Sequence, residues 1–109
     1  MKKIKFEAKK LGNQHIFGEK TDSDMYVSFG ILDKVPESER LHSHTKTVEF
    51  YVFLSGEGKF QINGEIIDVC AGDAIEVDIG EVHKLYSVSE VLTYFVVKKR
   101  VGDDRIFHD

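Results

Sequence analysis

Glycine-containing turns divide this chain of 109 residues into short segments in which apolar and polar side chains alternate. Alternation with a period of two is typical of strands with one buried face, and no stretch longer than a turn has a helical period. Asn63-Gly64 is the strongest hairpin signal, because both residues tolerate the positive φ of a tight two-residue turn. The predicted core face of one strand comprises Met25, Val27, Phe29 and Ile31. The pattern predicts an all-β fold, a sandwich or a small barrel.

Two segments, residues 48–54 and 91–97, are almost entirely apolar and are predicted to be strands buried on both faces. A turn at residues 56–58 is predicted to follow the first of them. Because a lone small barrel exposes its outer surface to water, an apolar outer face indicates an interface. We therefore predict a homodimer that packs sheet against sheet through Phe50, Val52, Leu54 and their counterparts Leu92, Tyr94 and Val96.

The composition limits the partners of the protein. The length predicts a single domain over residues 1–109. A net charge of −4 without a basic stripe argues against nucleic-acid binding. No apolar run approaches the roughly 18 residues that span a bilayer, so we expect no membrane segment. The single cysteine, Cys70, cannot form an internal disulfide, which favours a cytoplasmic location. We interpret Cys70 as a small buried or half-buried apolar residue.

Three histidines and one glutamate form the most informative set of polar residues. His42 and His44 are two positions apart, so on a strand both imidazoles project from the same face. Residues 45–47 must bend, because Glu49 has the wrong parity to share that face on an uninterrupted strand. A third imidazole, His83, lies on a later strand. Three imidazoles and a carboxylate are competent ligands for a divalent transition metal.

These residues resemble the two sequence motifs of the cupin family. The first motif, G(X)5HXH(X)3–4E(X)6G, is matched over residues 36–56 by His42, His44, Glu49 and Gly56, with Pro36 in place of the opening glycine. The second motif, G(X)5PXG(X)2H(X)3N, is matched over residues 72–87 by Gly72, Gly80 and His83, with Asp78 for the proline and Ser87 for the asparagine. The positions that differ from the motifs lie at turns and at the last residue of the second motif. None of them is a position that carries a metal ligand in the motifs.

The resemblance implies a jelly-roll barrel, or double-stranded β-helix, of two antiparallel sheets. It also implies one divalent transition metal per chain inside one end of the barrel, bound by His42, His44, Glu49 and His83. We favour Fe or Mn, and Zn, Ni, Co or Cu are also compatible with nitrogen and oxygen ligands. The alternative is a metal-free, hydrogen-bonded polar cluster, which is costly to bury without a counter-charge.

The predicted partner is a small molecule bound beside the metal, in a pocket lined by Tyr51, Phe53, Leu85 and Ser87. Candidate catalytic residues are Glu49 and Tyr51. The favoured function is a metal-dependent enzyme acting on a small oxygen-bearing metabolite, by dioxygenase or by isomerase or epimerase chemistry. A non-catalytic sugar- or metabolite-binding or sensor protein is the alternative, and a structural dimer with a stabilising metal is a third. The sequence does not predict the substrate.

Overall fold

The computed structural model describes residues 14–20, 25–99 and 103–109, and the described part of the chain contains strands but no helix. The strands are β1 (Gln14–Lys20), β2 (Met25–Leu32), β3 (His42–His44), β4 (Glu49–Ile62), β5 (Glu65–Cys70), β6 (Ala74–Val77), β7 (His83–Lys99) and β8 (Arg105–Phe107). All their pairings are antiparallel, which confirms the predicted all-β class. Within the described residues nothing has the length and hydropathy of a membrane-crossing helix. The sequence Asp22-Ser23-Asp24, whose residues are typical of a turn, lies outside the described residues.

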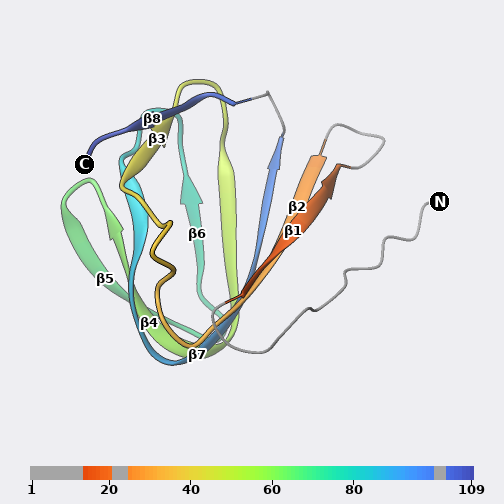
Figure 1. The fold of residues 1–109 in the computed structure, drawn as a ribbon, viewed down its shortest axis with the longest axis vertical. Coiled ribbons are helices and arrows are strands. Elements are labelled where there is room, and N and C mark those ends of the chain that lie inside the picture. Colours follow the sequence, from red (N-terminus) through yellow and green to blue (C-terminus); the bar gives the residue numbers. More distant parts are fainter. Residues whose placement is uncertain (1–13, 21–24, 100–102) are drawn as a thin grey trace.

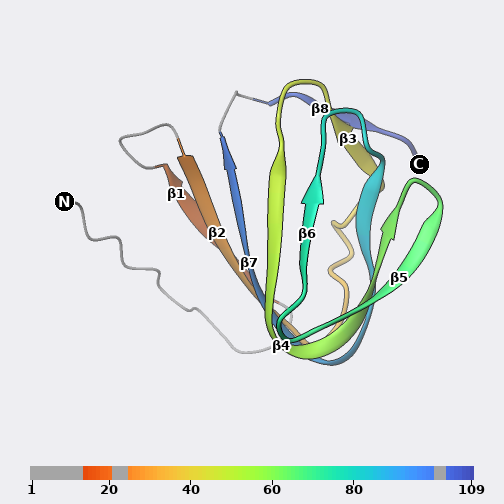
Figure 2. The ribbon, with the colours of Figure 1, turned by 180° about the vertical axis from the view of Figure 1, so that it is seen from behind.

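Two long strands, β4 and β7, each take part in both layers of the fold. The first part of β4 pairs with β6 and with the last part of β7, which continues through β2 to β1. The second part of β4 pairs with β5 and with the first part of β7, which continues through β3 to β8. The two layers meet where β4 and β7 bend and diverge from there, as Figures 1 and 2 show from opposite sides. This arrangement confirms the predicted jelly-roll barrel.

Gly56 bends β4 where the sequence predicted a turn. The strand does not end at residues 56–58, because register shifts on either side of this glycine let it curve while it stays paired with β7. The φ of Gly56 is 84°, and a Cβ at this position would lie 2.0 Å from the carbonyl oxygen of Val91. Only glycine therefore permits the close approach of the two strands at the bend.

The core lies between the two layers and consists of alternate residues from five strands: Leu32, Phe53, Phe60, Val69, Val77, Leu85, Leu92, Tyr94 and Val96. The core face of β2 was predicted wrongly. Ser28, Gly30 and Leu32 are buried, whereas the predicted face from Met25 to Ile31 is only half-buried. The reason is steric, because a Cβ on Gly30 would lie 2.6 Å from the ring of Tyr94. Ser28 and Gly30 are small and leave room for this aromatic ring. Because these two residues are not hydrophobic, the sequence pattern did not identify their face of β2 as the core face.

The strands that were predicted to be buried on both faces have one exposed face within the protomer. Phe50 is 45% exposed and Leu54 is 47% exposed. The predicted counterparts on β7 were wrong by one residue, since Leu92, Tyr94 and Val96 belong to the core. Strand pairing instead places Phe95 and Val97 beside Val52 and Phe50. We define the outer apolar face as Val27, Phe29, Ile31, Phe50, Val52, Leu54, Phe95 and Val97.

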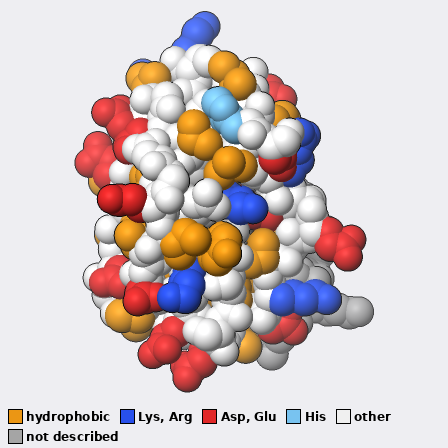
Figure 3. Space-filling view, turned by 90° about the vertical axis from the view of Figure 1, so that its left-hand side faces the viewer, with side chains coloured by type: hydrophobic (Ala, Val, Ile, Leu, Met, Phe, Trp, Pro, Cys, Tyr) orange, Lys and Arg blue, Asp and Glu red, His pale blue; other side chains and the backbone are white. Residues whose placement is uncertain are grey.

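Exposed hydrophobic residues also occur away from the outer apolar face. Ile66 on β5 is 47% exposed and Ile79 is 51% exposed. On the side of the molecule shown in Figure 3, hydrophobic side chains form small groups, with charged side chains between and around them. Single exposed hydrophobic residues of this kind are ordinary, so they do not by themselves mark an interface.

The hairpin between β4 and β5 confirms the predicted turn, since the φ angles of Asn63 and Gly64 are 50° and 83°. Cys70 at the end of β5 is exposed, which corrects the prediction of a buried residue. Val69 faces the core, so strand alternation turns Cys70 outward. The neighbouring carboxylate of Asp73 raises the pKa of the Cys70 thiol. The thiol is therefore not activated as a nucleophile.

We predict that Gly56→Ala destabilises the protein far more than Gly64→Ala, although both glycines have a positive φ. Gly64 has open space where a Cβ would lie, so its substitution should cost only the backbone strain of about 1–2 kcal/mol. Substitution of Gly56 must also separate β4 from β7 and should cost more than about 3 kcal/mol. Urea unfolding measures both free energies, and equal losses would contradict the assigned role of Gly56.

Candidate metal centre

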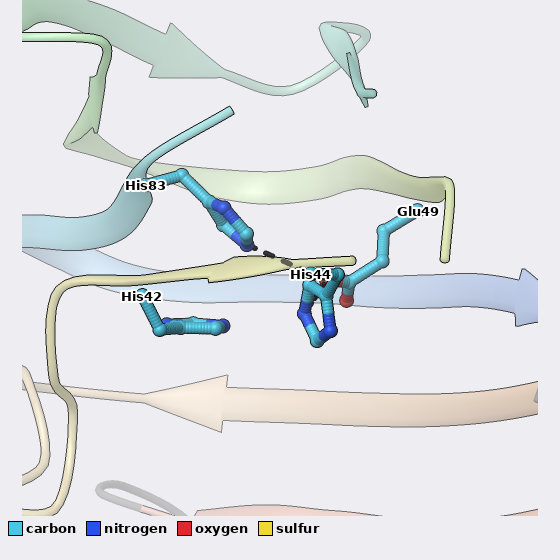
Figure 4. A group of neighbouring side chains, drawn as sticks. All are labelled: His42, His44, Glu49 and His83. Atoms are coloured by element: carbon cyan, nitrogen blue, oxygen red, sulfur yellow. Dashed lines mark ion pairs between the residues drawn. The ribbon is translucent and has the colours of Figure 1, made fainter. Parts of the chain in front are cut away.

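Four side chains that are distant in sequence meet at one end of the barrel. His42 and His44 come from β3, Glu49 is the first residue of β4 and His83 is the first residue of β7. One ligand atom of each residue lies within 4.8 Å of the ligand atoms of the others. Figure 4 shows these side chains turned toward a common point. The structure therefore brings together the four residues that the sequence predicted as metal ligands.

Two local features place these side chains together. His42 and His83 are direct partners in the pairing of β3 with β7, so their imidazoles are adjacent. The chain bends at Thr45 and Lys46, as the parity of Glu49 predicted, and the Thr45 amide donates to the carbonyl of Asp104 at 3.1 Å. Because of this bend, the side chain of Glu49 lies beside that of His44.

Each histidine ring uses its Nδ1 atom in a hydrogen bond that points away from the cluster. The partners are oxygen atoms, which can only accept, so Nδ1 donates and Nε2 of a neutral ring is left without a proton. The three bonds are His42 to the Arg40 carbonyl at 2.7 Å, His83 to the Glu81 carbonyl at 2.9 Å, and His44 to Asp104 Oδ1 at 2.8 Å. Three unprotonated Nε2 atoms can therefore face a shared ligand.

The ligand atoms are buried without hydrogen-bond partners, and this observation tests their fit to a metal. His44 Nε2, His83 Nε2 and Glu49 Oε1 are inaccessible to solvent and make no hydrogen bond of acceptable geometry. Glu49 Oε1 nevertheless lies 2.5 Å from His44 Nε2 and 3.4 Å from His83 Nε2. Unsatisfied buried polar atoms cost a few kcal/mol each, and one cation would satisfy all three. The donor set fits a divalent transition metal.

The protonation states of the cluster follow from burial and neighbouring charges. Burial lowers the pKa of His42 to about 4, so this imidazole is neutral near pH 7. Burial opposes the charge of Glu49, but the close approach of the His44 and His83 imidazoles holds its pKa below its usual range. Burial likewise opposes the charge of His44, but Glu49 and Asp104 raise its pKa. Glu49 and Asp104 therefore favour the charged form of His44, whereas burial favours the neutral form of His42.

A cavity of about 480 Å³ opens beside the cluster and is lined by His42, His44 and Glu49. Tyr51 also lines it, as the sequence predicted, and its ring centroid lies 6.1 Å from that of His83. Burial raises the pKa of Tyr51 well above its ordinary value, so its hydroxyl keeps its proton. Beyond the ligands, the cavity therefore offers an uncharged hydroxyl to a bound molecule.

Phe53, Leu85 and Ser87 are not among the residues that line this cavity. Phe53 shares the parity of Glu49 and Tyr51 but lies deeper, where its ring packs 5.7 Å from that of Tyr94. Leu85 pairs with Phe60 in the core, and Ser87 pairs with Lys59. Parity identified the correct face of these strands, but it did not predict how far the cavity extends along them.

Glu39 also lines the cavity, and the sequence prediction missed it. It lies in the loop between β2 and β3, whose polar sequence is typical of a surface loop. Burial raises the pKa of its carboxyl above the ordinary value, although the charge of His83 opposes the shift. No local signal distinguished Glu39 from Glu37, because only the folding of the loop over the barrel buries it.

Comparison with known proteins gives a consistent result. The sequence model of the cupin domain family matches residues 32–98, which is more than half of the chain and includes all four cluster residues. An oxalate-binding protein from Thermotoga maritima is 42% identical over 45 residues, which cover 41% of this chain. The matched region spans only 37% of the length of that relative.

Solved structures resemble the whole barrel at low sequence identity. Pac13 from Streptomyces, a nucleoside dehydratase solved with uridine, has a TM-score of 0.75 at 16% identity, over 99% of this chain and 92% of its own. A double-stranded β-helix protein from Klebsiella pneumoniae has a TM-score of 0.72 at 20% identity, over 90% and 85% of the two chains. At such identities the likeness establishes the fold alone.

Proposed function

The chain belongs to the cupin family, and we propose that it is a metal-dependent enzyme that acts on a small, acidic, oxygen-bearing metabolite. The observation that carries the proposal is the convergence of buried, unpaired His44 Nε2, His83 Nε2 and Glu49 Oε1 beside an open cavity. With His42 they would bind one Fe or Mn ion per chain, the metals that we favour among the divalent series.

When bound, the ion would supply a Lewis acid that polarises a substrate oxygen or, for Fe, a site for dioxygen. The proton transfers fall to side chains of the cavity. Glu39 lines the cavity and burial raises the pKa of its carboxyl, so we assign it the transfer of a proton to or from the substrate. Tyr51 stays protonated and can donate a hydrogen bond to a substrate oxygen. Of the two catalytic candidates predicted from sequence, we assign Tyr51 to catalysis and Glu49 to the metal.

The charges around the cavity favour an acidic ligand. Arg40 is paired with Asp109 at 3.0 Å, and Arg105 is paired with Asp103 at 3.0 Å. Lys98 pairs across the sheet with Glu49 and with Tyr26, so its side chain is on the inner face of β7. Within the part of the chain that is described, Lys98 forms no ion pair, and its ammonium lies 5.3 Å from the Tyr26 ring centroid.

A divalent ion would neutralise Glu49 and leave the charge of Lys98 uncompensated beside a positive centre. A ligand with a carboxylate or similar anionic group would restore the balance. The whole chain has a net charge of −4, so this preference comes from the cavity lining and not from the overall charge. We therefore infer that Lys98 binds the anionic group of the ligand.

A non-catalytic binding protein is the second candidate. The observation that favours it is the Thermotoga maritima relative, which is described as binding oxalate and not as converting it. The same metal site and the same Lys98 would serve either function. Only turnover separates the two, because fold and site do not specify the reaction.

A homodimer is the assembly that we propose. The outer apolar face exposes Phe50 and Leu54 by nearly half, and β2, β4 and β7 contribute to it. An apolar sheet face of this kind is buried in a second layer or in an interface. A second copy of the same chain presents a self-complementary face, so it can cover this surface by two-fold symmetry.

The first test concerns the metal. After removal of metals with a chelator, the protein should bind one Mn(II) ion per chain, measured by competition with a coloured chelator. His83→Ala should weaken this binding by more than about 100-fold, because it removes one of four ligands. The control is Tyr86→Ala, since Tyr86 lies on the same strand as His83 but is 46% exposed and outside the ligand set. A protein that binds no divalent transition ion would overturn the proposal.

The same metal-loaded sample decides between enzyme and binding protein. It is incubated with keto acids, sugar acids and dicarboxylates, in the presence and in the absence of oxygen, and the products are identified by mass spectrometry. Turnover of any of them supports the enzyme. Tight binding without turnover supports the second candidate.

The second test concerns Lys98. Lys98→Met should weaken oxalate binding to the metal-loaded protein by about tenfold to a hundredfold, because one charged hydrogen bond is lost. Lys99→Met is the matched control, since Lys99 is the next residue and is exposed. Calorimetry measures both affinities. If the two variants bind oxalate equally well, Lys98 does not determine the charge of the ligand.

The third test concerns the dimer. Sedimentation at micromolar concentration should give the mass of two chains, and Phe50→Asp should give one chain, because it places a charge on the outer apolar face. Ile66→Asp is the control, since Ile66 is similarly exposed but lies on β5, outside this face. A monomeric wild-type protein would contradict the proposed assembly.

A further inference from the structure

The segment from residue 103 to residue 109 contributes a strand to the metal centre. Its strand β8 pairs with β3 and places Phe107, Ile106 and Arg105 opposite the ligand-bearing residues 42–44. The family match ends at residue 98, so this segment lies outside the matched region. Apart from Ile106 and Phe107 its sequence is polar and carries no motif that predicts a function. Its contacts with β3 indicate that it supports the two ligands that β3 carries.

Asp104 is the residue of this segment that reaches the cluster. Its side chain is 6% exposed, and Oδ1 accepts a hydrogen bond from His44 Nδ1 at 2.8 Å. Oδ2 accepts from the backbone amide of Lys46 at 2.9 Å and from the Thr47 hydroxyl at 2.7 Å. These bonds leave little rotational freedom to the carboxylate, because each oxygen has its own donors.

His44 depends on a side chain for its orientation, and the other two ligand histidines do not. His42 and His83 donate from Nδ1 to backbone carbonyls two residues away, so local chain geometry fixes their rings. His44 donates to a carboxylate 60 positions later in the sequence. A carboxylate accepts only, which forces the proton of a neutral ring onto Nδ1 and frees Nε2 for a metal.

We propose that Asp104 is a positioning residue of the metal centre, which fixes the His44 ring so that unprotonated Nε2 faces the ion. The inference rests on the metal binding proposed above. Asp104 does not touch the ion or the substrate. It acts through His44, in the manner of the carboxylates that orient metal-bound imidazoles in many sites.

The decisive variant is Asp104→Asn, which keeps the shape of the side chain. The Lys46 amide and the Thr47 hydroxyl both require an acceptor, so the single amide oxygen of the new residue turns toward them. Its NH₂ group then faces His44 Nδ1, which must accept, and the ring proton moves to Nε2. The variant therefore opposes metal binding through the ring tautomer, without removing a ligand.

Two measurements test this proposal, with zinc as the diamagnetic probe. Zinc affinity, measured by chelator competition, should fall about 10- to 100-fold in Asp104→Asn. In nitrogen-15 NMR of the protein at saturating zinc, the wild type should show a His44 Nδ1 proton in slow exchange with water. Asp104→Asn should lose this signal, while the His42 and His83 signals persist. Asp103→Asn is the control, because Asp103 is exposed and its hydrogen bonds to described residues all involve Arg105.

The outcomes separate the possible failures. If the wild type binds no zinc, the proposed metal site is wrong. If the wild type binds zinc and Asp104→Asn binds it equally well, only the role of Asp104 is wrong. A loss of affinity with an unchanged His44 signal would also overturn the proposal, because it would indicate a purely structural effect. Asp104→Ala provides a check when Asp104→Asn folds poorly, and it should lose the His44 signal and weaken zinc binding too.

Discussion

The arrangement of this protein depends on the burial of one carboxylate among three imidazoles. Burial of such a cluster is unfavourable on its own. Three of its nitrogen and oxygen atoms are shielded from water and make no hydrogen bond in exchange. Strands β3, β4 and β7 hold it together because each begins or lies at the same end of the barrel, where the two layers diverge. The strands of the barrel thus force the four side chains together. A cation bound between them is the simplest species that would make their burial favourable.

The cavity beside the cluster explains why a small molecule is the natural partner. It is open on one side to the cluster and on the others to Glu39, Tyr51 and Lys98, which differ in charge and in hydrogen-bonding capacity. Burial keeps Tyr51 protonated and favours protonation of Glu39, whereas Lys98 supplies a positive charge. If the cluster binds an ion as proposed, these three side chains and the ion would offer an anionic ligand four different contacts. Solved proteins of the same fold differ in function, so these side chains and not the barrel must determine the chemistry.

The sequence predicted the elements that depend on local patterns. The strand alternation, the Asn63-Gly64 hairpin and the bend after His44 follow from parity and turn chemistry. The convergence of the four cluster residues was implied by the resemblance to the cupin motifs. Prediction from the sequence failed where contacts between residues distant in the chain determine the structure. The core face of β2 contains Gly30 because Tyr94 of another strand fills the space, and hydrophobicity therefore indicated the opposite face. Glu39 and Asp104 were missed for the same reason, since only tertiary contacts bring a loop and a late segment against the cluster.

The pairing of β8 with β3 also has a consequence for the order of events in the cell. Residues 103–109 are synthesised after every other part of the barrel, and β3 lacks one of its neighbours until they emerge from the ribosome. Before that moment the Nδ1 atom of His44 lacks the Asp104 carboxylate to which it donates. If the cluster binds an ion as proposed, a nascent chain with a folded core but without this segment would bind that ion more weakly than a chain in which β8 has paired with β3.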